Sequence, residues 1–275
     1  MPKFKLKFAA PLLAALTLVG TGLAHADQLA DIKKAGTLIC GTLGTAEPFS
    51  FPNPQTREIQ GYDIDFCAAI AKSLGVKLEI KAISVPARIP ELQQSRVDVL
   101  AANLGWTAER AEQIAFSDSY FVSRQMAAAR RADKFKSPAD LSGKRVAAAK
   151  GSTSELAAKK AIPNVNTVTF QDPPALFLAL QQSKVDGVAL SELVLVKWKK
   201  ESEASTPIDI LEPELITEPW GVGMRKGETG LINHVNQTLS SMERSGEAGK
   251  IFDKWLGVGT TYNLKRTFKI EPIKG

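Results

Sequence analysis

Segments typical of strands and of helices alternate along almost the whole chain. Residues 37–41 read as a buried strand, residues 63–74 have apolar side chains at helical spacing, and residues 77–83 alternate apolar and charged side chains. The order returns in residues 145–149, a strand, and 154–161, a helix. This alternation predicts an α/β fold of two similar units with largely parallel sheets.

A C-terminal segment is left over after the second unit. Residues 218–224 are extended and glycine-rich, and an amphipathic helix follows with apolar side chains at helical spacing: Ile232, Val235, Leu239 and Met242. The chain is therefore expected to leave the first unit and to return to it later. Because small-ligand sites commonly lie between such units, we expect a cleft there that hinge closure can bury.

The first 26 residues have the pattern of a secretory signal peptide. Three lysines precede the apolar run 8–19, and Ala24-His25-Ala26 follows as a small-x-small cleavage pattern. The run is shorter than the roughly 20 residues that span a bilayer. We expect cleavage after Ala26 and a periplasmic protein, with an uncleaved N-terminal anchor as the alternative.

The charge of the chain excludes one class of partner. Because the signal segment holds three lysines and no acid, the formal net charge of +6 falls to +3 in the mature chain. The lysines near residue 199 are followed by Glu201 and Glu203, as on a solvated helix face. No basic stripe interleaved with aromatic residues is present in the sequence, so no nucleic-acid partner is expected.

The two cysteines, Cys40 and Cys67, allow two interpretations. An oxidising compartment would permit a disulfide between them. Cys40 also sits in an apolar strand and Cys67 on the apolar stripe of a helix, so packing as free buried thiols accounts for both positions. The sequence leaves the two states open.

Several motifs resemble those of the family 3 extracellular solute-binding proteins, the amino-acid receptors of ABC importers. They follow the pattern of that family in order and spacing: Gly61-Tyr62-Asp63-Ile64-Asp65-Phe66, then residues 96–100, 107–110, 116–121, 150–155 and 221–227. Residues 87–93, 245–248, 252–255 and 263–264 most resemble the branch that binds glutamate and aspartate. The match covers nearly the whole mature chain.

The resemblance implies a type II periplasmic binding protein fold, with two α/β lobes joined by two hinge strands around a ligand cleft. We expect lobe one to comprise residues 27–120 and 223–275, and lobe two, with the hinge strands, residues 121–222. The hinges would lie near residues 120–124 and 218–224.

A receptor for a free amino acid needs a partner for the α-carboxylate. Arg110 is the strongest candidate, because a guanidinium binds a carboxylate in two places and the family has its carboxylate-binding arginine at this motif position. Ser152 and Glu155 fit a capping box that starts a helix at Thr153, where free N–H groups favour an anion. By resemblance, Arg110 binds the carboxylate from lobe one, and Ser152 and Thr153 bind it from lobe two. The alternatives are a surface arginine paired with a neighbouring acid, and a helix start that serves only as a cap.

The partner for the α-ammonium departs from the family pattern. Relatives usually have an aspartate where this chain has Ser191, followed by Glu192. Glu192 takes over the ammonium, or the ligand lacks an ordinary α-amino group, or Ser191 caps a helix beside an exposed Glu192. The sequence does not separate these alternatives.

The side-chain pocket departs as well. Arg88 matches the second pocket arginine of the acidic-ligand branch, and Gly105 replaces a threonine that often binds ligand, with Asn103 two residues earlier. Other positions where relatives have an aromatic clamp or a further arginine hold small or apolar residues: Leu43, Ala46 and Val85. A polar or acidic amino acid, or a related carboxylate, is the expected ligand.

The expected function is capture of this ligand for an ABC permease, by a monomer that closes as a clamshell and needs no metal or cofactor. The alternative is an enzyme, a periplasmic dehydratase acting on prephenate-like cyclohexadienyl acids, with Glu192 as general acid. His234 is the only histidine of the mature chain and lies far from the matched segments, which disfavours a catalytic triad or a histidine-rich metal site.

Overall fold

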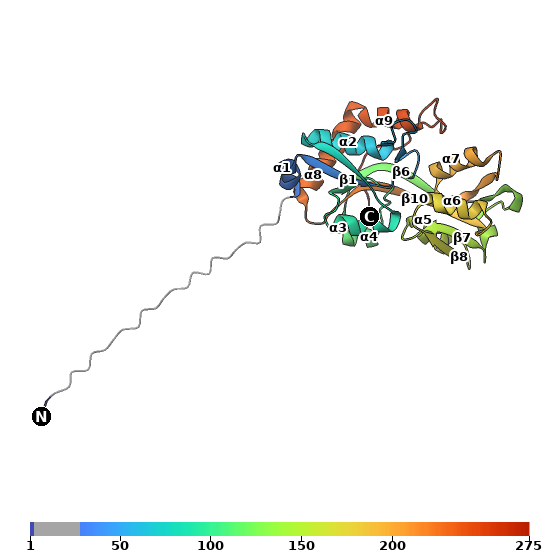
Figure 1. The fold of residues 1–275 in the computed structure, drawn as a ribbon, viewed down its shortest axis with the longest axis horizontal. Helices are drawn as coiled ribbons and strands as arrows, with labels where there is room; N and C mark the ends of the chain where they lie inside the picture. Colours follow the sequence, from blue (N-terminus) through green and yellow to red (C-terminus); the bar gives the residue numbers. More distant parts are fainter. Residues whose placement is uncertain (3–27, 275) are drawn as a thin grey trace.

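The computed structural model describes residues 1–2 and 28–274. Most of the expected signal peptide and its cleavage site after Ala26 lie outside the described residues. Figure 1 shows two α/β lobes side by side, with two long strands passing between them. Within the described part of the chain, no helix has the length and apolar character needed to cross a membrane.

Lobe one is built on parallel strands. β1 (Thr37–Thr42) lies between β4 (Lys77–Ala82) and β5 (Val99–Leu100) and pairs with both in parallel. The helices of this lobe are α1 (Gln28–Ala35), α2 (Tyr62–Leu74), α3 (Arg88–Gln93), α4 (Ala108–Gln113), α8 (Thr229–Ser245) and α9 (Glu247–Leu256). In Figure 1, α2, α8 and α9 lie on one side of the strands, and α3 and α4 lie on the other.

Lobe two repeats this plan. β7 (Arg145–Ala149) pairs in parallel with β8 (Asn166–Phe170) and β9 (Gly187–Ser191). Its helices are α5 (Thr153–Ala161), α6 (Pro173–Gln181) and α7 (Glu192–Ser202). The short elements of the chain are the hairpin strands β2 (Phe51–Pro52) and β3 (Ile59–Gln60) and the 3-10 turns η1 (Val85–Ala87), η2 (Arg131–Asp133) and η3 (Pro138–Leu141).

Two crossing strands join the lobes. β6 (Ala115–Arg130) and β10 (Ile208–Met224) pair antiparallel along their length, and they complete a sheet of order β4-β1-β5-β10-β6-β9-β7-β8. The sheet is therefore mixed rather than largely parallel, because the chain leaves lobe one along β6 and returns along β10. The expected strand 208–211 and the extended segment 218–224 are parts of one strand, whose register is irregular between Leu211 and Ile216.

A disulfide joins Cys40 in β1 to Cys67 in α2. The interpretation as two free thiols is therefore wrong, although both cysteines are fully buried as their positions predict. The bond fastens a helix to the central strand of lobe one, close to the motif at residues 61–66.

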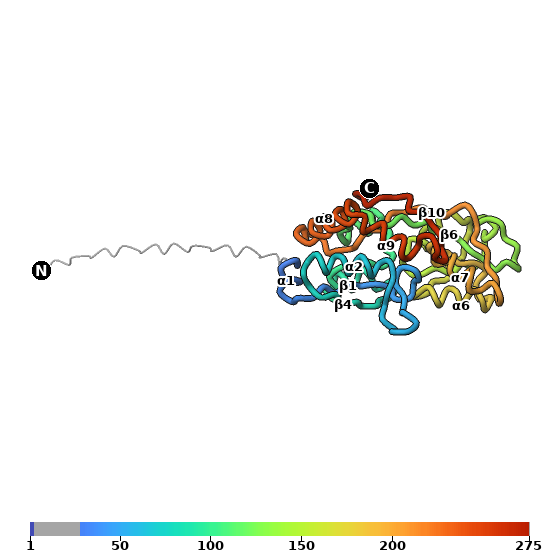
Figure 2. Tube along the Cα trace, turned by 90° about the horizontal axis from the view of Figure 1, so that it is seen from above, coloured from blue at the N-terminus to red at the C-terminus, as the bar shows by residue number. Residues whose placement is uncertain are grey.

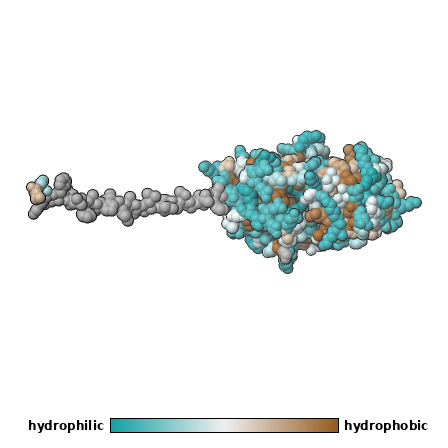
Figure 3. Space-filling view, turned by 90° about the horizontal axis from the view of Figure 1, so that it is seen from below, coloured by the Kyte–Doolittle hydropathy of each residue, from teal (hydrophilic) through white to brown (hydrophobic). Residues whose placement is uncertain are grey.

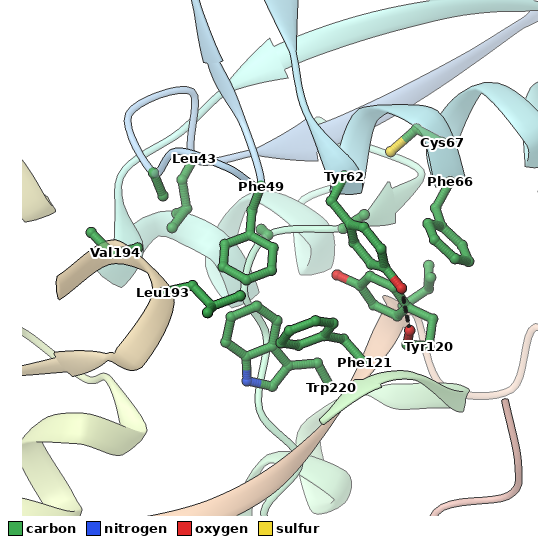
Figure 4. Packing of buried hydrophobic residues seen from close by; sticks show 14 of the residues in the cluster. Leu43, Phe49, Tyr62, Phe66, Cys67, Tyr120, Phe121, Leu193, Val194 and Trp220 are labelled. Atoms are coloured by element: carbon green, nitrogen blue, oxygen red, sulfur yellow. Dashed lines mark hydrogen bonds between the residues drawn. The ribbon is translucent and has the colours of Figure 1, made fainter. Parts of the chain in front are cut away.

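An aromatic cluster packs where the crossing strands meet lobe one (Figure 4). The ring of Phe49 lies 4.8 Å from that of Trp220 and 5.0 Å from that of Phe121, measured between centroids, both in edge-to-face arrangements. Tyr62 donates a hydrogen bond to the carbonyl oxygen of Tyr120 at 2.9 Å, drawn as the dashed line in Figure 4. These contacts anchor β6 and β10 to lobe one.

The C-terminal segment runs back over the crossing strands (Figure 2). The amide of Ser119 in β6 donates to the carbonyl of Glu271 at 2.8 Å, and Arg266 pairs with Glu243 of α8 at 2.6 Å. The tail therefore covers the side of the hinge that faces away from the cleft.

The face of the molecule in Figure 3 is mostly hydrophilic, with smaller hydrophobic areas toward its middle and right.

Candidate functional site

A small cavity of about 30 Å³ lies between the lobes. Five residues predicted for the ligand site line it: Arg88, Asn103, Ser152, Thr153 and Ser191. Leu43, Ala46 and Val85 line it as well. A cavity of this size has room for about a water molecule, and ligand pockets are usually at least ten times larger. The structure therefore shows the cleft in a closed arrangement.

Direct contacts between the lobes accompany this closure. Arg110 donates from Nη2 to the carbonyl of Gly151 at 2.9 Å. Val85 N donates to Gln171 O at 3.2 Å, and Lys197 Nζ lies 3.0 Å from a Glu47 carboxylate oxygen. A ligand larger than water must enter before these contacts form, so the lobes have to separate for binding.

Arg110 is buried at the N-terminal end of the short helix α4. Its amide donates to the capping hydroxyl of Thr107 at 3.1 Å, and its Nη1 donates to the carbonyl of Gly105 at 2.6 Å. Burial lowers the pKa of Arg110, and the carboxylate of Glu218 acts in the opposite direction. The surface-arginine alternative is wrong, because the residue is only 7% exposed and faces lobe two.

α5 begins at Thr153 with Ser152 as its N-cap, as the sequence predicts, but only the Ser152 half of the expected capping box forms. Ser152 accepts the amide of Glu155 at 3.1 Å, and the Glu155 carboxylate accepts the amide of Gly151 at 2.8 Å. Thr153, the first residue of the helix, donates its hydroxyl to Glu218 at 2.8 Å. The helix end lies at the cleft, and one of its expected ligand donors is bound by an acid of the protein.

Arg88 and Asn103 line the lobe-one side of the cavity. Arg88 donates to backbone carbonyls, those of Val85 at 3.0 Å and of Ala102 and Asn103 at 2.9 Å. Its pKa is lowered to about 9 by burial first and by Arg110 second, so it stays charged at neutral pH. The buried Oδ1 of Asn103 accepts no hydrogen bond from any described residue.

Asp63 supports this side of the site from behind. It accepts the hydroxyl of Tyr120 at 2.8 Å and the amide of Asn103 at 3.2 Å. Burial raises the pKa of Asp63 to about 7, and these hydrogen bonds and the charge of Arg88 oppose that rise. The loop that holds Asn103 is thus fixed by an acid whose charge changes near neutral pH.

Ser191 and Glu192 face opposite sides of the crossing strands. Ser191 is 3% exposed, lines the cleft cavity, and has its hydroxyl 3.2 Å from that of Ser123. Glu192 pairs with Arg124 at 2.9 Å and lines a cavity of about 400 Å³ behind the crossing strands, between α7 and the tail. The structure does not bring Glu192 to the other predicted site residues.

The sequence reasoning missed a buried acid at the base of the cleft. Oε1 of Glu218 in β10 accepts hydrogen bonds from Gln125 at 3.0 Å, Trp220 at 2.9 Å and Thr153 at 2.8 Å. Burial raises the pKa of Glu218, and the hydrogen bonds from Trp220 and Thr153 and the charges of the nearby arginines oppose that rise. The available signal was an acid inside a glycine-rich extended segment, which was interpreted only as a hinge.

Gly105 lies against this acid. A Cβ atom at position 105 would come within 2.4 Å of the Glu218 carboxylate. The cleft therefore brings together Arg110, Gly105, Thr153 and Glu218 from both lobes and from a crossing strand, with Arg88 and Asn103 beside them.

Curated relatives match most of the chain. A glutamine-binding protein of an ABC transporter from Bacillus subtilis (strain 168) is 30% identical over 234 residues, which cover 84% of this chain and 85% of the relative. A glutamate/aspartate import solute-binding protein from Escherichia coli (strain K12) is 27% identical over 265 residues, covering 89% and 87%.

Solved structures agree with these relatives. An ancestral arginine-binding protein bound to arginine has a TM-score of 0.76 and 36% identity, covering 81% of this chain and 99% of that one. An ancestral amino-acid-binding protein described as a precursor of cyclohexadienyl dehydratase has a TM-score of 0.76 and 33% identity, covering 83% and 99%. The model of the bacterial extracellular solute-binding proteins, family 3, matches residues 38–258. With its motifs, its fold and this match, the chain belongs to family 3 of the bacterial extracellular solute-binding proteins.

Proposed function

We propose that this protein captures a polar or acidic amino acid, or a related carboxylate, between its lobes and delivers it to an ABC permease. Its family membership and the names of its relatives support a role in amino-acid import. The binding of the ligand carboxylate by Arg110, Ser152 and Thr153, and the lobe boundaries at residues 120 and 222, belong to this proposal.

One contact between the lobes supports this proposal most directly. Arg110 reaches from lobe one to the carbonyl of Gly151, one residue before the N-cap of α5 in lobe two. A buried guanidinium facing the N-terminus of a helix is a strong setting for a carboxylate, because both carry positive charge toward it. A ligand bound there contacts both lobes, so binding favours the closed form over the open one.

A thermal-shift screen over amino acids, organic acids and opines tests the proposal. A ligand at 100 times its dissociation constant adds about 2.7 kcal/mol to the free energy of unfolding, which raises the melting temperature clearly. We expect at least one amino acid to do so. No stabilisation by any compound of these classes would contradict the proposed function.

Export belongs to the same proposal. We expect the mature protein in the periplasm, as a monomer that starts at Asp27 after cleavage behind Ala26. Mass spectrometry of the protein from a periplasmic fraction checks this, and an intact mass that includes residues 1–26 would contradict it.

A dehydratase is a second candidate because of one structural neighbour, the ancestral precursor of cyclohexadienyl dehydratase. That neighbour is itself described as an amino-acid-binding protein, and the acid first considered for catalysis, Glu192, lies behind the crossing strands. The dehydratase candidate is tested by incubating the protein with prephenate and following the absorbance of the product. Measurable turnover would show that the protein is an enzyme and would contradict a role in binding alone.

A further inference from the structure

Donors expected to hold a ligand carboxylate are engaged by acceptors of the protein itself. Thr153 donates to Glu218 at 2.8 Å, while Arg110 donates to the carbonyls of Gly105 at 2.6 Å and Gly151 at 2.9 Å. Glu218 is also the acid that acts most strongly on the pKa of Arg110. A carboxylate of the protein therefore lies beside the helix end and the arginine that the ligand needs.

The room for this carboxylate comes from a glycine. A Cβ atom at position 105 would lie 2.4 Å from Oε1 of Glu218 and 2.5 Å from Oε2, closer than real contacts allow. Any side chain at position 105 would have to displace the Glu218 carboxylate. The position of the Glu218 carboxylate thus depends on Gly105: the absence of a side chain at position 105 makes space for an acid 113 positions further along the chain.

The charges around the cleft partly offset one another. Arg88 and Arg110 are 3% and 7% exposed, and Glu218 attracts both. Asp63 also acts on Arg88, but its pKa of about 7 leaves it partly protonated at neutral pH. None of the described residues that line the cavity is acidic. With Glu218 ionised, its charge therefore offsets part of the positive charge that the two arginines bring to the cleft.

We propose that Glu218 sets the charge of the ligand by taking up part of the anion-binding capacity of Arg110 and Thr153. The cleft then prefers a ligand with one carboxylate and a neutral polar side chain over a ligand with two carboxylates. This inference rests on the proposed function and narrows its ligand class. The α-carboxylate and α-ammonium of a free amino acid cancel, so glutamine brings no net charge into the cleft. The second carboxylate of glutamate has to approach Glu218, which already accepts the hydroxyl of Thr153, where little water screens the repulsion.

Glutamine and glutamate are the probes, because they have nearly the same shape and differ by one charge. Calorimetric affinities for both are measured with the wild type, with Glu218→Gln, and with Glu214→Gln as a control. Glu214 lies in the same strand, but its side chain is 40% exposed and pairs with Arg124. We expect the wild type to prefer glutamine, and Glu218→Gln to shift the affinity ratio roughly tenfold toward glutamate, since a buried charge is removed. Glu214→Gln should leave the ratio unchanged.

Gly105→Ala is a second route to the same result. Its methyl group displaces the Glu218 carboxylate, so the ratio should move in the same direction as in Glu218→Gln. This variant keeps every charge, which separates the position of the carboxylate from the net charge of the protein. It also keeps the test decisive if Glu218→Gln fails to fold.

Two results would overturn the inference. One is a ratio of glutamate affinity to glutamine affinity that stays at the wild-type value in both variants. The other is a loss of glutamine binding in Glu218→Gln with no gain for glutamate, which would make Glu218 the partner of the ligand ammonium. If no compound of the thermal-shift screen stabilised the wild type, that result would instead contradict the proposed function.

Discussion

The two faces of the crossing strands hold charge in opposite ways. On the cleft face, one acid, Glu218, is 3% exposed and accepts hydrogen bonds from three neutral donors. On the back face, one arginine, Arg124, has a side chain that is 35% exposed and pairs with three acids, Glu192, Glu212 and Glu214.

The difference lies in solvent access. Water and salt screen the back-face ion pairs, so each is worth at most about 1 kcal/mol and can rearrange when the hinge moves. On the cleft face, loss of a partner leaves a buried polar group unpaired, which costs more. Changes on the cleft face should therefore alter binding and stability strongly, and equivalent changes on the back face should alter them little.

The largest effect is expected for Arg110→Ala. The variant loses the guanidinium that faces the helix end of lobe two, and truncating one partner of a buried charge pair typically costs about 2–5 kcal/mol of binding. Calorimetry with the ligand found by the screen should show at least a roughly thirtyfold loss of affinity. Arg124→Ala is the matched change on the back face and should bind normally; an Arg110→Ala variant with retained affinity would remove Arg110 from the site.

The pH dependence of stability should report Asp63. Its pKa is raised by burial from 3.8 to about 7, so between about pH 4 and pH 7 the folded state binds more protons than the unfolded state. The stability that this group contributes is present at low pH and lost as pH rises toward 7, a change of a few kcal/mol at about 1.4 kcal/mol for each pKa unit.

Asp63→Asn should flatten this dependence, because an amide stays neutral throughout the window. Urea unfolding of the wild type and the variant at roughly pH 4.5 to 8 measures how the free energy of unfolding depends on pH. Parallel curves for the variant and the wild type would show that Asp63 is charged in the folded state at all these pH values.

Thr153→Val should have a smaller effect. The variant keeps the shape of the side chain and removes one of three donors to the buried Glu218 carboxylate, which should lower the free energy of unfolding by about 1–3 kcal/mol. Thr217→Val is the control, because Thr217 is exposed on the back of the same strand. Equal urea midpoints for the two variants would break the contrast between the two faces.

Arg124→Gln should have the smallest effect. Its partners are partly exposed, so unfolding free energy should fall by about 1 kcal/mol or less, and the difference should shrink further at high salt. Urea melts at low and high salt provide the measurement. A larger, salt-independent loss would mean that the back-face network is as important to the hinge as Glu218.

Local patterns in the sequence predicted the elements and part of the site. Hydrophobic period and turn residues were sufficient for most strands and helices, and Ser152 and Glu155 identified the start of α5 because capping is a local interaction. Arg110 came from the resemblance of its motif. The disulfide stayed open, since packing alone accounts for both cysteines.

Contacts between segments that are distant in the sequence could not be predicted from local patterns. The role of Glu218 depends on β10 bringing residue 218 next to Thr153, 65 positions away, and next to Gly105. Glu192 was a candidate only through its position next to Ser191. The chain changes from strand to helix between these two residues, so Ser191, the last residue of β9, lines the cleft and Glu192, the first residue of α7, faces the back.

A crystal structure with the ligand found by the screen tests the central claim most directly. We expect the ligand between the lobes, with its carboxylate within hydrogen-bonding distance of Arg110 and the N-terminus of α5. A ligand seated behind the crossing strands, in the cavity beside Arg124 and Lys265, would contradict the account.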